Sequence, residues 1–268
     1  MTLKGFVNAF RMSVGYVLHQ ITSGNRHDAH SPFLYSLLTD GIYTKEKSEQ
    51  FKAIEERRQF LLRDHTQLAV TDFGAGSSIN QKPVQRTVKE ITSRFAKSPG
   101  FCRLLFKIVK YMKPEVIVEL GTSMGLSTMY LASGNPSAKV YTLEGCTETA
   151  KRAIQNFDAC GYTNISCITG DFDSTLYPLL KKTGKLDLLF IDGNHTYEAT
   201  LRYFRMALPY LSSKSVIIFD DINWSEGMQK AWHEIVSGKE VTLSVDFYIV
   251  GLTFFDTALS KQHFKMRY

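Results

Sequence analysis

Short apolar runs alternate with amphipathic helical stretches from residue 116 onward, and this alternation constrains the fold more than any other feature of the chain. Strands made of nearly continuous apolar side chains are typical of a parallel sheet that helices cover on both faces. The last run, 241–255, leaves no room for a crossover helix, so its two strands must form an antiparallel hairpin that turns near Asp246–Phe247 or at Gly251. We therefore expect an α/β fold with a mostly parallel sheet and an antiparallel last strand. The other candidate strands are 116–120, 139–144, 165–170, 186–192 and 215–221.

The N-terminal part of the chain has a different texture. Residues 1–65 mix helical stretches with polar turns, and we find no recognisable motif before residue 97. An amphipathic stretch, 101–114, directly precedes the first strand of the alternating region. We therefore expect two parts, a mainly helical N-terminal extension or lid over 1–97 and a ligand-binding α/β domain over 98–268.

Two glycine-rich stretches each follow an apolar run, VTDFGAGSS at 70–78 and VELGTSMGLS at 118–127. Ligands of open α/β sheets bind outside the carboxyl ends of strands, so a cofactor loop needs a strand before it and a helix after it. It also needs a second strand that ends in an acid, which can bind ribose hydroxyls. Only the loop at 118–127 meets these conditions, because the next strand ends at Glu144. We expect 72–77 to be a surface turn or a flexible lid segment over the cofactor.

Glu119, Gly121 and Gly125 form an acid-x-G-x-x-x-G pattern, which differs from the G-x-G-x-x-G of dinucleotide sites. The pattern resembles motif I of the class I S-adenosylmethionine-dependent methyltransferases. The resemblance continues in order over about 116–255, through Glu144, TGDF, LLFIDGNHTYEA and IIFDDINWS. It implies a Rossmann-like sheet of seven strands with S-adenosylmethionine as cofactor. The cofactor-binding residues that we assign on this basis are Glu119, Gly121, Thr122, Ser123, Gly125, Ser127, Glu144, Gly170, Asp171 and Asp192.

Within that superfamily, FIDGNHTYE followed by FDDINW resembles the metal-dependent O-methyltransferases of the catechol and macrocin types. Physical chemistry points the same way, because Asp192, Asp220 and Asp221 end adjacent strands of the expected sheet. Three converging acids repel one another unless a cation lies among them, and all-oxygen ligands suit Mg²⁺. We expect these three acids to bind Mg²⁺. The alternative is helix capping by Asp192 or Asn194 and by Asp221.

His195 lies three residues after Asp192, at the place where the catechol type carries a catalytic lysine. A histidine can act as a general base at neutral pH, so we assign His195 and Asp192 as catalytic residues. A purely structural role for His195 is the alternative. Tyr197 and Trp224 are candidates for the acceptor pocket unless they belong to the core.

The amino-acid composition limits the binding partners and the cellular location that we expect for the protein. The net charge of +6 comes from scattered lysines and arginines, which favours solubility over nucleic-acid binding. The four cysteines lack metal-site spacing and fit the reduced thiols of a cytoplasmic protein. The N-terminal stretch contains Lys4 and Arg11, so it is a poor signal peptide and too polar to span a bilayer. His27 and His30 predict a capped turn or a flap in preference to a metal site.

The sequence therefore predicts a cytoplasmic S-adenosylmethionine-dependent methyltransferase that, with Mg²⁺, methylates a hydroxyl of a small molecule. A homodimer is compatible with this prediction. One alternative is a metal-independent RNA or protein methyltransferase. Another is a cofactor-binding protein whose catalysis has decayed.

Overall fold

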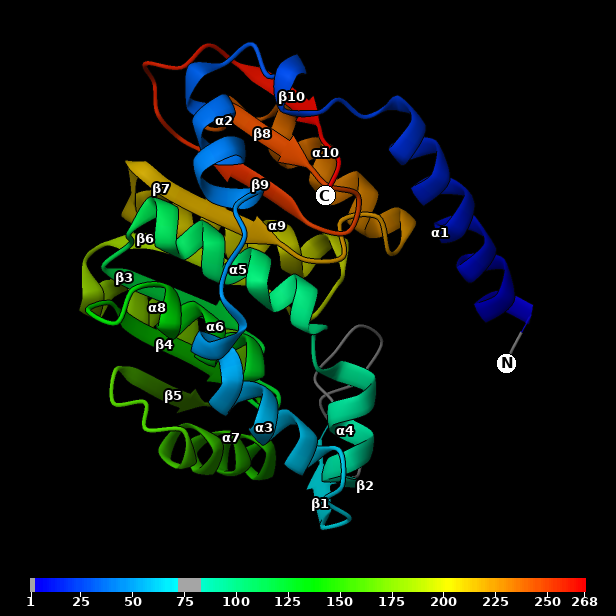
Figure 1. The fold of residues 1–268 in the computed structure, drawn as a ribbon, viewed down its shortest axis with the longest axis vertical. Helices are drawn as coiled ribbons and strands as arrows, with labels where there is room; N and C mark the ends of the chain where they lie inside the picture. Colours follow the sequence, from blue (N-terminus) through cyan, green and yellow to red (C-terminus); the bar gives the residue numbers. More distant parts are fainter. Residues whose placement is uncertain (1–2, 72–82) are drawn as a thin grey trace.

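The computed structural model describes residues 3–71 and 83–268, and its centre is an eight-stranded sheet (Figure 1). The strand order is β10-β8-β9-β7-β6-β3-β4-β5. Strands β3 to β7 pair in parallel, whereas β9 is antiparallel to both β7 and β8. The strands are β3 (Val116–Leu120), β4 (Lys139–Glu144), β5 (Ile165–Thr169), β6 (Leu186–Ile191), β7 (Leu211–Phe219), β8 (Leu243–Asp246), β9 (Gly251–Phe254) and β10 (Gln262–Lys265).

All seven expected strands are present, but the prediction of seven strands is wrong by one. The additional strand, β10, pairs in parallel with β8 at the edge of the sheet. Its four residues, QHFK, alternate between partly buried and exposed positions. A strand this short and this polar has no continuous apolar run, which explains why the sequence pattern did not indicate it. The expected hairpin is confirmed, with its turn at 247–250 between β8 and β9.

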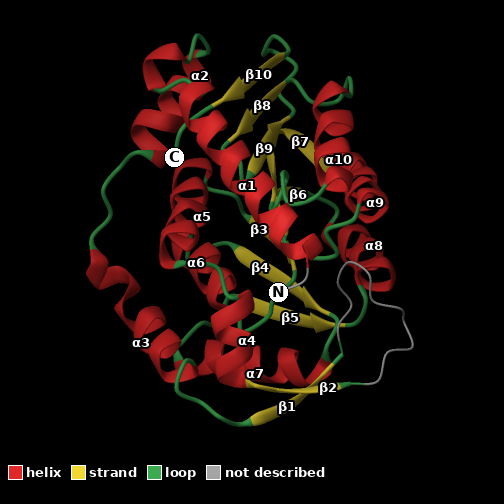
Figure 2. Cartoon of the chain, turned by 90° about the vertical axis from the view of Figure 1, so that its right-hand side faces the viewer, coloured by secondary structure: helices red, strands yellow, loops and turns green. Residues whose placement is uncertain are grey.

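Helices cover both faces of the sheet (Figures 1 and 2). Successive residues of a strand point to opposite faces, and β3 shows this directly: Ile117 packs in one apolar cluster and Val118 in another. The first face carries α5 (Pro99–Met112), α6 (Leu126–Gly134) and α7 (Thr147–Ala159). The second face carries α8 (Phe172–Thr183), α9 (Tyr197–Ala207) and α10 (Glu226–Ser237). Both faces are apolar, as the continuous strand pattern requires.

The N-terminal part is mainly helical, as expected. It contains α1 (Leu3–Thr22), α2 (Pro32–Ser36) with the π-turn Leu37–Ile42, α3 (Lys52–Leu61), the antiparallel pair β1 (Gln67–Val70) and β2 (Val84–Thr87), and α4 (Val88–Phe95). Leu34, Leu38 and Ile42 are fully buried in the same apolar cluster as the sheet residues. This part of the extension therefore shares the core of the α/β domain. The proposed boundary at 97/98 falls in the short connection between α4 and α5.

Three further expectations concern the N-terminal part. Asn25 caps a short turn by accepting the backbone N–H of His27, so His27 lies in the predicted capped turn and His30 follows that turn. Among the described residues, none of the helices is both long enough and apolar enough to cross a bilayer. The glycine-rich segment 72–77 lies outside the described residues.

Candidate functional site

The turn after β3 brings the backbone of two strand ends into contact. Gly121 has φ = +105°, and a Cβ placed on it would lie 2.1 Å from the backbone oxygen of Asp192. Only glycine allows this approach, because any side chain would strike the end of β6. Gly125 has φ = +77° and begins α6, and a Cβ there would lie 2.3 Å from the ring of Phe157. The spacing of the two glycines thus follows from two separate close contacts.

Glu144 ends β4 directly beside this turn. Its carboxylate accepts the backbone N–H of Ser123 at 2.9 Å and that of Cys146 at 2.9 Å. Burial raises the pKa of Glu144, and these backbone hydrogen bonds act in the opposite direction. Gly121, Ser123, Glu144 and Asp192 all line one cavity of about 540 Å³. The structure therefore brings the predicted ribose-binding acid and the glycine loop together.

The predicted cofactor residues do not all reach this cavity. Glu119 is fully buried, and its carboxylate accepts the hydroxyls of Ser127, Thr128 and Thr142. Burial raises the pKa of Glu119 to about 7, against these hydrogen bonds. Thr122 is also buried, and its hydroxyl lies 2.6 Å from that of Thr142. Glu119, Thr122 and Ser127 do not line the cavity, and they support the loop from behind through these hydrogen bonds.

Gly170 and Asp171 lie at the end of β5, where they form the start of α8. Asp171 is the N-cap of α8 and accepts the backbone N–H of Ser174 at 2.9 Å. The next residue, Phe172, lines the cavity. Capping is therefore the role that the structure shows for Asp171, and the aromatic ring beside it is the group that faces the cavity.

Asp192, Asp220 and Asp221 converge at the ends of β6 and β7, as expected. Asp192 and Asp221 line the cavity, whereas Asp220 is 1% exposed and lies behind them. Other residues cap the neighbouring helices: Thr196 caps α9 and Ser225 caps α10. Thr196 thus takes the capping role at α9 that the alternative gave to Asp192 or Asn194, whereas capping of the short turn 222–227 by Asp221 stays a prediction.

The sequence analysis missed Lys97, which lies between α4 and α5. Its ammonium lies 2.9 Å from Oδ1 of Asp192 and forms a second ion pair with Oδ2 of Asp220. Lys97 also lines the cavity. A lysine more than ninety residues before the acids, outside any motif, carries no signal in the sequence. The sequence indicated only that three converging acids need a cation among them, and it did not indicate which group supplies the positive charge.

Burial and charge shift the pKa values in this cluster. Burial raises the pKa of Asp192 well above its ordinary value, and Lys97 opposes this shift. Burial and the neighbouring Asp220 raise the pKa of Asp221 to about 6. Burial disfavours the charge on Lys97, but the carboxylates of Asp192 and Asp220 outweigh it and hold the pKa of this ammonium above its usual range. The cluster therefore contains a charged lysine.

His195 lies at the cavity with its Nε2 atom 3.6 Å from Oδ1 of Asp192 and 3.9 Å from Oδ2 of Asp221. Burial lowers the pKa of His195, so its imidazole is neutral near pH 7 and can accept a proton. Trp224 lines the same cavity, as expected. Tyr197 does not, because its hydroxyl donates to Glu234.

The backbone is strained at this cavity. Ser123, Asn194 and Asp221 line it, and each has a φ of about 50°, in the left-handed region that favours glycine. Residues in this region cost about 1–3 kcal/mol each and cluster at functional sites. Elsewhere in the described part of the chain, only Lys113 and Tyr248 are non-glycine residues with positive φ.

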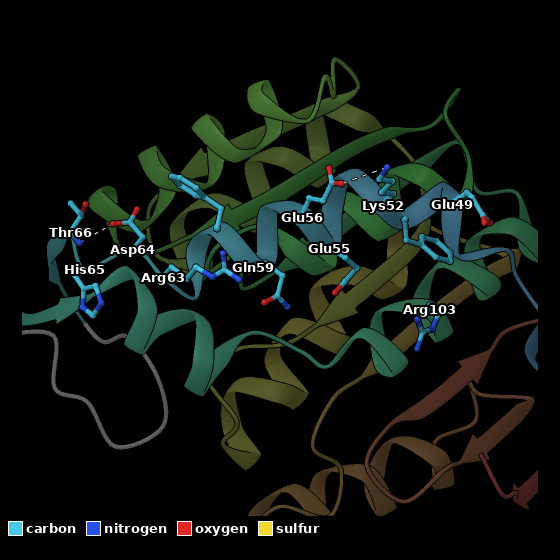
Figure 3. Close-up of a pocket in the computed structure, with 12 residues that line it drawn as sticks. Glu49, Lys52, Glu55, Glu56, Gln59, Arg63, Asp64, His65, Thr66 and Arg103 are labelled. Atoms are coloured by element: carbon cyan, nitrogen blue, oxygen red, sulfur yellow. Dashed lines mark hydrogen bonds and ion pairs between the residues drawn. The ribbon is translucent and has the colours of Figure 1, made fainter.

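A larger open groove of about 1150 Å³ runs along α3 (Figure 3). Its walls carry both acids and bases, among them Glu55, Arg63 and Arg103. Lys52 and Glu56 form an ion pair along the helix at 3.8 Å. The mixed charges and the pairing within α3 give this groove no single electrostatic preference.

Residues 118–222 match a protein family whose description is "Methyltransferase domain". This segment contains the glycine loop, Glu144 and the three acids. The matched segment is thus a methyltransferase domain, and the strand order with the antiparallel β9 is the fold of the class I S-adenosylmethionine-dependent methyltransferases.

Several proteins of similar sequence are O-methyltransferases. O-methyltransferase hkm8 of Aspergillus hancockii is 28% identical over 190 residues, which cover 64% of this chain and 73% of that protein. Catechol O-methyltransferase of Niastella koreensis is 29% identical over 128 residues, covering 47% of this chain and 57% of that protein. The chain spans just over half the length of several of the curated relatives that it matches.

Solved structures share the fold. The S-adenosylhomocysteine-bound methyltransferase PaMTH1 of Podospora anserina has a TM-score of 0.57 at 16% identity, covering 78% of this chain and 92% of that one. The O-methyltransferase TomG of Streptomyces achromogenes, solved with S-adenosylmethionine, has a TM-score of 0.54 at 20% identity and covers 86% of this chain and 96% of that one.

Proposed function

We propose that this protein transfers a methyl group from S-adenosylmethionine to a hydroxyl of a small molecule. The observation that supports this proposal most strongly is that a single cavity joins Glu144 and the glycine loop to His195 and Asp192. The cavity thus has a nucleoside-binding part at one end and a proton acceptor at the other. The relatives named above are O-methyltransferases, which supports the choice of an oxygen acceptor.

S-adenosylmethionine supplies a methyl group on an electrophilic sulfonium when it is bound. Glu144 binds the ribose hydroxyls, and the turn at Gly121 leaves room for the rest of the molecule. Neutral His195 accepts the proton of the acceptor hydroxyl. The oxygen then bonds to the methyl carbon as the carbon–sulfur bond breaks, which leaves S-adenosylhomocysteine. Positioning the two reactants in one cavity contributes much of the acceleration.

Binding of Mg²⁺ by Asp192, Asp220 and Asp221 stays a prediction from the sequence. In favour of a metal, ligand atoms of Asp192, His195 and Asp220 all lie within 4.8 Å of one another. Asp220 Oδ1 is also buried, with no hydrogen-bond partner among the described residues. Against a metal, the ammonium of Lys97 already forms ion pairs with Oδ1 of Asp192 and with Oδ2 of Asp220. The cluster in this arrangement does not leave a full set of oxygens for a divalent ion.

Several finer expectations accompany this proposal. A cytoplasmic location, a homodimer and the lack of a nucleic-acid partner all stay predictions. Metal-independent methylation of RNA or protein is the second candidate function. The ion pair of Lys97 with Asp192 favours a reaction without a metal, but it does not favour RNA or protein as the acceptor. The part of the chain that binds the acceptor includes the cavity wall around Trp224.

Titration calorimetry with S-adenosylhomocysteine, with and without Mg²⁺, tests the proposal. We expect one binding site per chain, followed by methyl transfer to a phenolic probe such as 1,2-dihydroxybenzene. A chain that does not bind S-adenosylhomocysteine under either condition would rule out methyl transfer. Binding together with transfer to RNA or protein, but to no small hydroxylated probe, would support the second candidate.

A further inference from the structure

We propose that Lys97 is a catalytic residue whose ammonium is the resident cation of the acid cluster, where it binds the acceptor oxygen in the place of a divalent metal ion. This inference rests on the proposed function, since it names the group that assists the same methyl transfer. It would make methyl transfer at this site independent of metal.

The position of the ammonium supports this role. A lysine ammonium has three N–H donors, and here Asp192 and Asp220 accept two of them. Lys97 lines the cavity, and its side chain retains 20% of its exposure. The third donor is therefore available to an oxygen in the cavity. That oxygen would lie next to His195, the proposed proton acceptor, which also lines the cavity.

Contacts on either side fix the backbone of Lys97. Its carbonyl oxygen accepts a hydrogen bond of 2.8 Å from Arg58, a residue of α3 that is only 6% exposed. The following residue, Ser98, caps α5 by accepting the backbone N–H of Phe101. The ring of Phe101 in turn lies 5.6 Å from the ammonium. A side chain anchored at both ends is built into the site, unlike an exposed lysine that meets an acid by chance.

The charges explain why one cation suffices. Lys97 faces Asp192 and Asp220 directly, and Asp221 adds to the negative field around it. A divalent ion among the same oxygens would lie beside a fixed positive charge and would compete with it for Asp192 Oδ1 and Asp220 Oδ2. The two cations are therefore alternatives at this cluster.

The reaction step balances without a metal. His195 takes the hydroxyl proton, and Lys97 donates a hydrogen bond to the oxygen as negative charge develops on it. The oxygen forms its bond to the methyl carbon, the carbon–sulfur bond breaks, and S-adenosylhomocysteine leaves. Lys97 keeps its own proton throughout and is unchanged at the end.

Binding of Mn²⁺, measured by electron paramagnetic resonance, tests this inference without an acceptor. We expect wild-type protein to bind Mn²⁺ weakly and Lys97→Ala to bind one ion at least about tenfold more tightly, because the acids lose their fixed cation. Lys97→Arg keeps the charge and should stay weak. Lys185→Ala is the matched control, since Lys185 also pairs with acids, Glu115 and Asp187, but outside the cavity.

Turnover of 1,2-dihydroxybenzene in excess EDTA provides the second measurement. Wild type should retain its activity, whereas Lys97→Ala should lose about a hundredfold and regain part of it when EDTA is removed and Mn²⁺ is added. Equal Mn²⁺ affinity in wild type and Lys97→Ala overturns the inference, and so does loss of wild-type activity in EDTA. Loss of S-adenosylhomocysteine binding in Lys97→Ala would instead assign the lysine to the cofactor.

These outcomes are distinguishable from failure of the proposed function. If wild type binds no S-adenosylhomocysteine, the methyltransferase proposal fails, and the Mn²⁺ titration still decides whether Lys97 excludes the metal. Lys97→Gln serves as a second variant if the alanine variant does not fold, because it removes the charge but keeps a hydrogen-bond donor.

Discussion

Two glutamates at the ends of neighbouring strands have different environments in this protein. Glu144 faces the cavity and receives two backbone N–H groups, whereas Glu119 is sealed behind the loop among hydroxyl groups. Both follow the same sequence signal, an acid at the end of an apolar run. Their surroundings decide which one can meet a ligand and which one supports the loop.

The first prediction concerns Glu144. Replacement by alanine removes charge-assisted hydrogen bonds to the ribose, which should weaken S-adenosylhomocysteine binding by about 2–3 kcal/mol in calorimetry. Glu144→Gln keeps one acceptor oxygen and should lose less. Glu148→Ala is the control, because Glu148 pairs with Lys151 at the exposed start of α7 and does not line the cavity. Affinity within twofold of wild type in Glu144→Ala would contradict the assignment of this strand end.

The second prediction concerns Glu119, whose pKa is raised to about 7. The folded chain then binds a proton more tightly than the unfolded chain, so stability falls as pH rises from about 4.5 to about 7. The loss should approach about 3 kcal/mol, and below that window it is absent. Glu119→Gln cannot ionise and should lack this fall. Urea unfolding at pH 5 and pH 8 measures the difference.

Glu198→Gln, on the exposed side of α9, is the control for this experiment. It should follow wild type at both pH values. If Glu119→Gln and wild type lose the same stability between pH 5 and pH 8, the carboxylate of Glu119 is ionised in the folded protein at the same pH as in the unfolded chain.

At the scale of elements, the start of the turn between β3 and α6 depends on the close approach of Gly121 to the end of β6. Gly121→Ala should disrupt it, because the new Cβ would lie 2.1 Å from the backbone oxygen of Asp192. We expect a lower melting temperature and loss of S-adenosylhomocysteine binding. Gly184→Ala is a matched control, since Gly184 also has positive φ but a Cβ there meets nothing within 4 Å.

Gly184→Ala should therefore cost only the backbone strain, about 1–2 kcal/mol in urea unfolding, with cofactor binding unchanged. Equal losses of binding in the two variants would show that backbone strain alone, and not the contact with β6, limits residue 121.

The elements that the sequence predicted are those with long, regular patterns. Continuous apolar runs gave β3 to β9, and the spacing of Gly121 and Gly125 gave the cofactor loop. The polar strand β10 has no such pattern. Lys97 lacks one as well, because its function depends on the distance between α5 and the ends of β6 and β7 in space. Periodicity within a segment cannot report a contact between segments so far apart in the chain.

At the scale of the whole molecule, the segment that follows α1 meets the C-terminal residues next to β10. Gly24 pairs with Met266, and Arg267 donates to the backbone oxygen of Ser23 at 3.0 Å. In Figure 1, α1 then extends from this junction along one side of the molecule. Its Arg11 donates to the backbone oxygen of Trp224, a residue of the cavity wall. The N-terminal helix is thus connected both to the edge of the sheet and to the candidate site.

The last prediction tests how α1 is held. His19 Nε2 lies 3.3 Å from Asp246 Oδ1, and the hydroxyl of Tyr248 donates to the backbone oxygen of Met12. A Cβ on Gly15 would lie 2.4 Å from that hydroxyl, so Gly15→Val should push Tyr248 away and break its hydrogen bond. Hydrogen exchange should then speed up along α1 and stay unchanged in β3, because the buried sheet does not depend on this contact. Val14→Ala is the control on the same helix, since Val14 is 42% exposed. Equal exchange of α1 in wild type and Gly15→Val would show that the junction at His19 and Gly24 holds the helix without Tyr248.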